Sequence, residues 1–243
     1  GAKTLSINQE FYTAVNGDTS GPFNFYIITA FAELLNQPYD YTMVRFLGIF
    51  LLGSSFVLLF LSLKNLFNLQ IASFVFWGMC LFVGKMRFSE FVFYGSEHFP
   101  IFQLSLLVYI FSCIDKVSLK LRSFLLLLSG ILVVTLFLSK LQAVPSTAAL
   151  LFGIWIKTLK MPNKFRQTIW LINGLLIAIV LVGYFFDKWG VLNEFYESYI
   201  QNNLTYQHAT SHEDYLYIIK KAFVSRGSGM LWAFISLLAL FVV

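Results

Sequence analysis

Residues 43–63 of this chain read MVRFLGIFLLGSSFVLLFLSL, and this stretch decides the class of fold. A helix needs about 20 predominantly apolar residues to cross the roughly 30 Å hydrocarbon core of a bilayer. The apolar residues here follow one another in a run, instead of recurring at the one-face spacing of a helix that has water on its other side. Residues 43–63 are therefore predicted to form a transmembrane helix.

Similar apolar stretches recur along the rest of the chain. They lie near residues 67–84, 99–114, 121–138, 142–158, 167–186 and 228–243. No Asp, Glu, Lys or Arg occurs in the middle of any of them. The sequence therefore predicts an all-α, polytopic transmembrane bundle of about seven spans. Because residues 231–243 are apolar up to the last residue, we expect the sequence to be a truncated piece of a longer protein.

The composition excludes a water-soluble domain. Hydrophobic residues make up 58% of the chain and charged residues 12%, and the mean hydropathy is +0.74. Soluble domains contain roughly 45–50% apolar and about 25% charged residues. The net charge of +5 comes from Lys and Arg scattered between the apolar stretches, which is typical of cytoplasmic loops and does not indicate a nucleic-acid partner. No phosphate-binding loop or dinucleotide fingerprint occurs in the sequence.

The polar segments divide the chain into four regions. Residues 1–42 are predicted to form a first outer loop, residues 43–186 the transmembrane core, residues 187–227 a second outer loop and residues 228–243 the start of a further span. Within the first loop, residues 22–35 follow Gly21-Pro22 and end before Pro38, which favours a helix lying at the membrane surface. An ordinary span with a slightly polar start remains the alternative for this segment.

The basic residues of the loops predict an orientation. They gather in alternate loops, which should face the cytoplasm: Lys64; Lys116, Lys120 and Arg122; Lys157, Lys160, Lys164 and Arg166. The remaining loops then face outward and carry most of the polar groups suited to chemistry: Glu10, Asp18, Glu90, Glu97, His98, Lys140, Gln142, His208, His212, Glu213 and Asp214. We therefore expect a single site on the outer face, at the boundary with the lipid bilayer.

Four short motifs carry a resemblance to a known family. They are EFYTAVNGDTSGPFNFY (residues 10–26), RFLG (residues 45–48), GSEHFP (residues 95–100) and KLQAVP (residues 140–145). In this order they resemble the GT-C glycosyltransferases, the group that contains protein O-mannosyltransferases and lipid A aminoarabinose transferases. The resemblance extends from Glu10 to about Phe186. The family's first span, its later spans and any soluble C-terminal domain have no counterpart here.

The resemblance implies an enzyme that moves a sugar from a polyprenyl phosphate to an acceptor, with inversion, at the outer face of the cytoplasmic membrane in the cell envelope. An acid after the family's first span would take the acceptor's proton, and the candidates are Glu10 first and Asp18 second. Either acid alternatively caps a helix or hydrates a loop. Lys140 with Gln142, and then Lys85 and Arg87, are candidates for binding the lipid phosphate. A lysine near the end of a span alternatively reaches to the interface without any role in binding.

Histidines supply a weaker set of candidates. Glu97 and His98 are adjacent and are candidates for binding a divalent metal cation or for positioning the acceptor. His208 and His212 have the i, i+4 spacing of a metal pair on a helix, without a complete metal-site motif. Asn203-Leu-Thr205 matches a glycosylation acceptor sequence, which is common by chance.

Two other functions stay open on the sequence alone. A polytopic transporter or lipid flippase would carry out no covalent chemistry and would be expected to hold polar groups near the middle of the bilayer. A non-catalytic membrane scaffold would use the outer loops to bind a partner protein.

Overall fold

The computed structural model describes residues 2–8, 10–12, 14–15, 20–85 and 94–209, without the side chains of Lys85 and of residues 206–209. Within these residues the chain is all-helical, and its one non-helical pairing is an isolated bridge between Phe11 and Val15. The elements are α1 (Ala2–Leu5), α2 (Phe23–Leu34), α3 (Tyr41–Leu66), α4 (Leu69–Lys85), α6 (His98–Cys113), α7 (Leu119–Phe137), η1 (Leu141–Ala143), α8 (Val144–Leu159), α9 (Lys164–Lys188), α10 (Leu192–Phe195), η2 (Tyr196–Gln201) and α11 (Asn202–Ala209).

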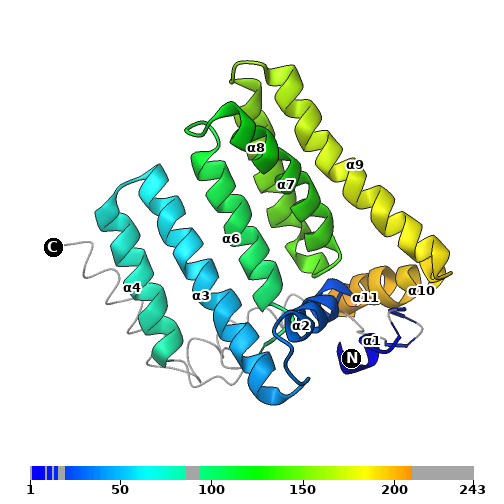
Figure 1. Cartoon of the computed structure of the whole chain (residues 1–243). Helices are drawn as coiled ribbons and strands as arrows, with labels where there is room; N and C mark the ends of the chain where they lie inside the picture. The colour runs from blue at the N-terminus through cyan, green and yellow to red at the C-terminus, as the bar shows by residue number, and fades with distance from the viewer. Residues whose placement is uncertain (1, 9, 13, 16–19, 86–93, 210–243) are drawn as a thin grey trace.

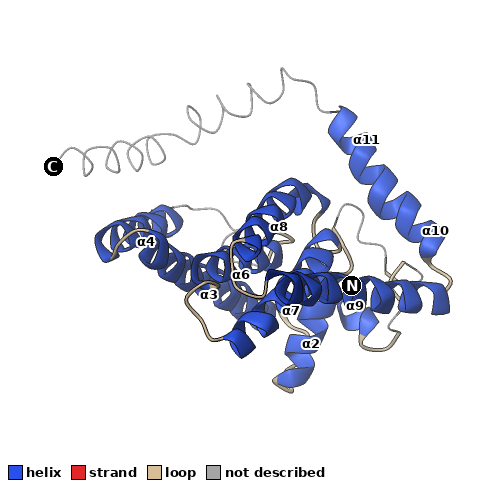
Figure 2. Cartoon of the chain, turned by 90° about the horizontal axis from the view of Figure 1, so that it is seen from above, coloured by secondary structure: helices blue, strands red, loops and turns tan. Residues whose placement is uncertain are grey.

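Among the described residues, six long helices run side by side, and each runs opposite to the one before it in the chain: α3, α4, α6, α7, α8 and α9 (Figure 1). The shorter α2, α10 and α11 lie across one end of this bundle, which we call the α2 end. Seen from above, α10 and α11 project from the α9 side of the bundle (Figure 2). The main packing pairs are α7 with α9 and α3 with α6.

The six predicted apolar stretches between residues 43 and 186 all form helices, and each end lies within three residues of its predicted position, with η1 extending the start of α8. Among the described residues, α3, α7 and α9 are long and apolar enough to cross a membrane. The helices α4, α6 and α8 contain 17, 16 and 16 residues. At 1.5 Å per residue a helix of this length covers about 24–26 Å, which is less than a typical bilayer core. These lengths and compositions indicate a membrane protein; the seventh predicted stretch, 228–243, lies outside the described residues.

The helix predicted near residues 22–35 is α2, which has 12 residues. It begins after Pro22, whose fixed φ suits the start of a helix. Beyond its last residue, Asn36 has a φ of 50°, a left-handed conformation that Asn tolerates and that turns the chain away from the helix axis. Its length of about 18 Å is too short for an ordinary span.

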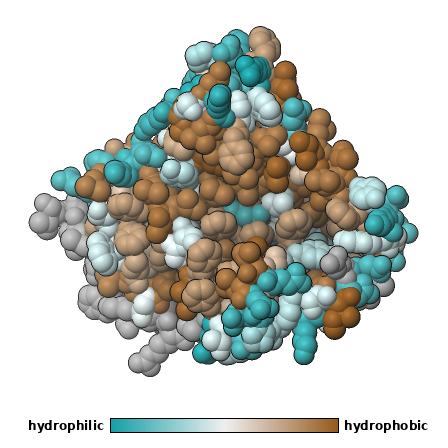
Figure 3. All heavy atoms as spheres, in the orientation of Figure 1, coloured by the Kyte–Doolittle hydropathy of each residue, from teal (hydrophilic) through white to brown (hydrophobic). Residues whose placement is uncertain are grey.

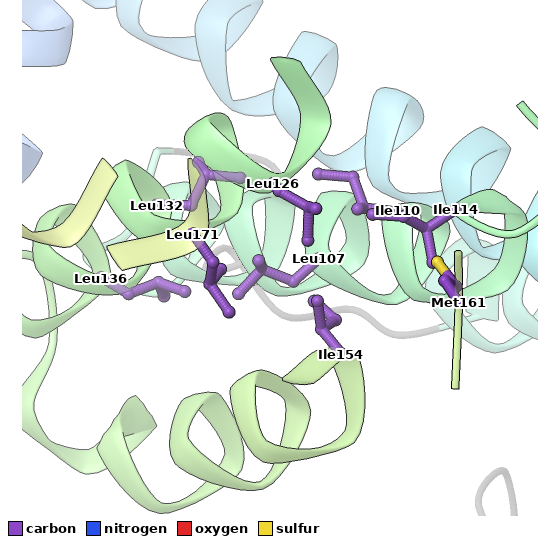
Figure 4. Packing of buried hydrophobic residues seen from close by; sticks show 9 residues of the cluster. All are labelled: Leu107, Ile110, Ile114, Leu126, Leu132, Leu136, Ile154, Met161 and Leu171. Atoms are coloured by element: carbon purple, nitrogen blue, oxygen red, sulfur yellow. The ribbon is translucent and has the colours of Figure 1, made fainter. Parts of the chain in front are cut away.

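The bundle core contains aliphatic side chains from four helices (Figure 4). Leu107 and Ile110 of α6, Leu126 and Leu136 of α7, and Ile154 of α8 are fully buried. Helices α7 and α9 approach more closely than side chains would allow, because Gly130 and Gly174 face each other's helices. A Cβ at either glycine would collide with the backbone of the partner helix. Small residues that permit backbone contact are a common feature of packed membrane helices.

The loops sort to the two ends of the bundle as the sequence predicts. At the end opposite α2, Lys116 Nζ donates a hydrogen bond to the Asn65 carbonyl at 2.7 Å and so joins two of the basic loops. At the α2 end, the Gly21 N–H donates to the Ser139 carbonyl at 3.1 Å. Between these polar ends, hydrophobic residues dominate the face of the molecule shown in Figure 3.

Candidate functional site

The predicted site residues that the structure describes lie at the α2 end of the bundle. Ser96 and Glu97 lie in the turn before α6, His98 is the first residue of α6, and Lys140 lies in the connection between α7 and η1. We call these four residues the rim cluster. They come together because α6 starts and α7 finishes at the same end of the bundle (Figure 1).

An ion pair is the centre of the rim cluster. Lys140 Nζ lies 2.8 Å from Glu97 Oε1 and also donates to Ser96 Oγ at 3.0 Å. The Ser96 hydroxyl donates to the same Glu97 oxygen at 3.0 Å. The Lys140 side chain is 18% exposed and the Glu97 side chain 60% exposed. The ammonium group is therefore held within the protein, while the carboxylate faces solvent.

Two opposing influences set the pKa of Glu97. Partial burial raises the pKa, but the hydrogen bonds and charge of Lys140, with a further hydrogen bond from Ser96, lower it by more. The pKa of Glu97 consequently lies below its ordinary value. The carboxyl group is ionised at neutral pH and is a poor proton donor there.

His98 is buried, with 4% of its surface exposed. Its Nδ1 accepts a hydrogen bond from the Gly95 N–H at 2.9 Å, which places the proton of a neutral imidazole on Nε2. The ring stacks on Tyr94 with 5.9 Å between centroids. A Cβ at Gly95 would lie 3.0 Å from Glu97 Oε2 and 3.5 Å from His98 Nδ1, so glycine allows the tight turn that presents both residues.

Beneath the rim cluster, a chain of buried polar groups ties the turn at Tyr94 to α2 and α7. The Tyr94 hydroxyl donates to Asn24, with 3.1 Å to its carbonyl oxygen, and Asn24 Nδ2 donates to the Ser139 carbonyl at 2.7 Å. The Ser139 hydroxyl lies 2.7 Å from the Thr135 carbonyl and 3.2 Å from Gln103 Oε1. Burial, with a smaller effect of Glu97, raises the pKa of the Tyr94 phenol well above its ordinary value, so this donor stays protonated.

Gln142 points toward the second outer segment instead of joining the rim cluster. Its Nε2 donates to Asn203 Oδ1 at 3.3 Å, and Asn203 Nδ2 donates to the Tyr199 carbonyl at 2.7 Å. Asn203 is fully buried in α11, and both ends of its amide are engaged. The asparagine of the Asn203-Leu-Thr205 motif is therefore enclosed in this fold and is not presented as a glycosylation acceptor.

Glu10 lies next to an aromatic cluster at the same end. Phe11 is fully buried against Phe25 and Tyr26 of α2, with ring centroids 5.3 Å and 6.2 Å apart. Tyr12 packs edge-on against Phe186 of α9 at 6.3 Å. These contacts hold Glu10, which is half-buried, close to α2. Among the described residues, the Glu10 carboxylate makes no hydrogen bond or ion pair, and its contact with the rim cluster stays a prediction.

Several predicted site residues lie outside the described part of the chain. They are Asp18, Glu90, Arg87, His212, Glu213 and Asp214, together with the side chains of Lys85 and His208. Their proposed roles stay predictions.

A metal at Glu97 and His98 is not favoured by the geometry of the described residues. No group of three or more His, Cys, Asp and Glu side chains with metal-binding geometry is found among them. The Lys140 ammonium group already lies 2.8 Å from Glu97, where a cation would have to sit. The metal role of Glu97 and His98 stays a prediction, and no chemical step is assigned to a cation.

An apolar groove opens between α3 and α6 and has a volume of about 640 Å³. It is lined by Ile49, Phe50, Gly53, Ser54, Val57, Leu58, Phe102 and Leu106. A Cβ at Gly53 would meet no atom within 4 Å, so the missing side chain contributes to the open space. Phe31 of α2 stacks on Phe50 at 6.2 Å and borders the groove on the side of α2.

The groove begins at the depth of the rim cluster. Helices α3 and α6 run in the same direction, and Asn65 Nδ2 donates to Ser112 Oγ at 3.2 Å, so residues 47 positions apart lie level with each other. Because both helices rise equally per residue, Glu97 is level with Phe50. The groove therefore extends from the level of the ion pair toward the middle of the bundle.

Comparison of this chain with family models, curated proteins and solved structures gave no match. Its function is therefore inferred from the geometry and from the sequence motifs.

Sequence reasoning missed several polar residues that organise the site. Asn24, Gln103, Thr135, Ser139 and Tyr199 are examples, and Tyr199 is fully buried with its hydroxyl donating to the Phe137 carbonyl at 2.6 Å. A signal existed for Gln103, because it is the lone amide side chain in an apolar helix, and polar groups within such segments face the protein interior.

Proposed function

We propose that this chain is part of a GT-C-type glycosyltransferase, which transfers a sugar from a polyprenyl-phosphate donor to an acceptor at the outer face of the cytoplasmic membrane. The seven-span topology and the truncation predicted from the sequence belong to this proposal. The motifs at residues 10–26, 45–48, 95–100 and 140–145 support it.

The observation that carries the proposal is the joint position of the groove and the rim cluster. A substrate with a long apolar chain and a charged head group requires an apolar surface that is open to lipid and that leads to a cation. The α3–α6 groove offers the first, and Lys140, which pairs with Glu97 at the depth where the groove begins, offers the second.

The transfer step assigns separate tasks to Glu10 and Lys140. An acceptor hydroxyl or amine forms a bond to the anomeric carbon of the sugar, and the bond from that carbon to the phosphate oxygen breaks. The acceptor proton passes to the Glu10 carboxylate, which acts as the general base. The electron pair of the broken bond leaves with the lipid phosphate, whose charge Lys140 stabilises.

The enclosed position of the Tyr94–Asn24–Ser139 chain supports a site with fixed geometry. These contacts connect α2, which follows the loop of Glu10, to the turn that presents Glu97 and to the residue before Lys140. The base and the phosphate-binding lysine would thus belong to segments held together by hydrogen bonds.

The test is sugar transfer by the Glu10→Gln variant of the intact protein in membranes, with a radiolabelled polyprenyl-phosphate sugar as donor. We expect transfer to fall by at least about 100-fold, the contribution typical of a general base, while membrane insertion is unchanged. Glu33→Gln is the matched control, because Glu33 is an exposed carboxylate on α2. Full transfer in Glu10→Gln would remove Glu10 from the mechanism.

A transporter or lipid flippase is the second candidate, and the polar Gln103–Thr135 pair supports it only as a polar contact inside the bundle, because a transport pathway requires polar groups near the middle of the bilayer. Gln103 Nε2 donates to Thr135 Oγ1 at 2.7 Å inside the bundle, near the α2 end. Substrate flux in proteoliposomes without any covalent product would support this candidate and would overturn the glycosyltransferase.

A further inference from the structure

The donors around Glu97 Oε1 form a small anion-binding arrangement. An ammonium group at 2.8 Å and a hydroxyl at 3.0 Å both donate to this one oxygen. A non-bridging oxygen of a phosphate ester has the same charge and accepts the same kinds of hydrogen bond. The Glu97 carboxylate therefore occupies a position that a phosphate oxygen would also fit.

The two partners differ in how easily they can move. Lys140 is mostly covered, and moving it would disturb its neighbours in the connection between α7 and η1. The Glu97 side chain is 60% exposed, so rotation about its side-chain bonds would carry the carboxylate into solvent. An exposed ion pair of this kind contributes only about 0.2–1 kcal/mol, so an anion with further contacts can displace it.

The start of α6 adds to the attraction for an anion. Glu97 is the residue that precedes this 16-residue helix, and its side chain makes no capping hydrogen bond to the helix. The positive end of the helix dipole therefore lies next to the rim cluster, where the Glu97 carboxylate is the anion that a phosphate would replace. It is a second source of positive potential beside Lys140.

We propose that Lys140 and Ser96 form a phosphate-ester subsite that Glu97 occupies in the unliganded protein, and that a lipid phosphate binds by displacing the Glu97 carboxylate. The apolar chain of this ligand lies in the α3–α6 groove. The subsite rests on the proposed function in one respect, because its ligand is the phosphate group of the proposed donor, which is also the phosphate of the leaving polyprenyl phosphate.

The experiment measures the binding of farnesyl phosphate to the intact protein in detergent by titration calorimetry. Glu97→Gln removes the competing charge, and we expect the affinity to rise about two- to fivefold, the equivalent of an exposed ion pair. Lys140→Met removes the cation, and we expect a loss of at least about tenfold. Lys140→Arg keeps the charge and should retain binding. An increase in affinity in Glu97→Gln cannot result from misfolding.

Asp115→Asn is the matched control, because Asp115 also pairs with a lysine at 2.8 Å but lies at the opposite end of the bundle. Its affinity for farnesyl phosphate should equal that of the unmodified protein. Unchanged affinity for farnesyl phosphate in Glu97→Gln would contradict competition between the Glu97 carboxylate and the phosphate. Unchanged affinity in Lys140→Met would contradict the phosphate-ester subsite.

Two further ligands identify the source of the phosphate. Farnesol should bind more weakly than farnesyl phosphate, and equal binding would overturn the role of the anion. Inorganic phosphate should bind much more weakly than farnesyl phosphate. Equal binding would show that the subsite takes free phosphate and would contradict a lipid phosphate as the ligand. Sugar transfer is measured separately. If the protein binds farnesyl phosphate through Lys140 but transfers no sugar, the subsite proposal stands and the glycosyltransferase proposal is wrong.

Discussion

Each end of the bundle holds a lysine paired with a carboxylate at 2.8 Å, but the two lysines have different surroundings. Lys157 also donates to the Phe111 carbonyl at 2.8 Å and lies 5.1 Å from the centroid of the Phe111 ring. A backbone carbonyl in α6 cannot move away without distortion of the helix. Lys140 instead contacts the side chains of Ser96 and Glu97. The same ion-pair distance therefore accompanies a fixed link at one end and an exchangeable one at the other.

The largest expected effect comes from exchanging each lysine for methionine. Lys140→Met should reduce sugar transfer by at least about tenfold, because the leaving phosphate loses a charged donor. Lys157→Met should leave the transfer rate unchanged but lower the stability of the protein by about 1–3 kcal/mol, because Asp115 and the Phe111 carbonyl lose their donor. Initial rates and thermal unfolding of both variants in detergent measure the two effects. Equal loss of sugar transfer in Lys140→Met and Lys157→Met would contradict a special role for the lysine at the α2 end.

The contact of α2 with the bundle gives the next effect. A Cβ at Gly21 would collide with the Leu138 carbonyl and would lie 3.0 Å from the Tyr199 hydroxyl. Gly21→Ala should therefore destabilise the protein by about 1–3 kcal/mol, as overpacking commonly does. Gly183→Ala is the control, because a Cβ there meets no atom within 4 Å. Equal unfolding temperatures for the two alanine variants would contradict the close approach at Gly21.

An effect of similar size is expected from the two asparagines that link helices at opposite ends. Asn24 is 2% exposed and donates to Ser139 at 2.7 Å, whereas Asn65 is half-buried and donates to Ser112 at 3.2 Å. Asn24→Ala should lower the unfolding free energy by about 1–3 kcal/mol, since buried partners are left unsatisfied, and Asn65→Ala by less. Denaturant unfolding in detergent compares them. A larger loss in Asn65→Ala would show that the α2 end is not the more tightly connected one.

The smallest effect concerns acid. Glu97 and Asp115 both have pKa values below their ordinary ones, because burial raises each pKa but the hydrogen bonds and charge of the paired lysine lower it by more. A carboxylate with a lowered pKa in the folded state stabilises the fold at neutral pH, and this contribution is lost as the pH falls through the folded-state pKa. The stability of Glu97→Gln and Asp115→Asn should therefore depend less on pH below about 5 than that of the unmodified protein. Parallel pH profiles for all three proteins would contradict the ion pairs.

The helices were predictable from the sequence because each one is an apolar run bounded by polar or turn-forming residues. Gly21-Pro22 and Pro38 marked the limits of α2 for the same reason. The pairing of Glu97 with Lys140 was not predictable, since these residues are 43 positions apart and meet only through the packing of α6 against α7. The basic residues of alternate loops predicted only that Glu97 and Lys140 lie at the same end of the bundle. They did not predict that the two side chains are in contact.

Buried hydrogen bonds were harder to anticipate than charges. Asn24 lies in the first turn of α2 and Ser139 in the turn after α7, and nothing in their local sequence shows that two residues 115 positions apart are bonded to each other. Gln142 shows the converse case, because its place beside Lys140 suggested a shared ligand, whereas its side chain turns to Asn203. Lys140 and Gln142 are two positions apart at the start of η1, and this separation is enough to direct their side chains to different neighbours.

The glycine contact between α7 and α9 determines which parts of the bundle are able to shift. Two helices whose main chains touch at Gly130 and Gly174 cannot slide along each other without first moving apart. The α7–α9 pair, on one side of α6, therefore resists relative movement of its two helices. Widening of the α3–α6 groove would therefore have to come from α3 and α4, which lie on the other side of α6 (Figure 1).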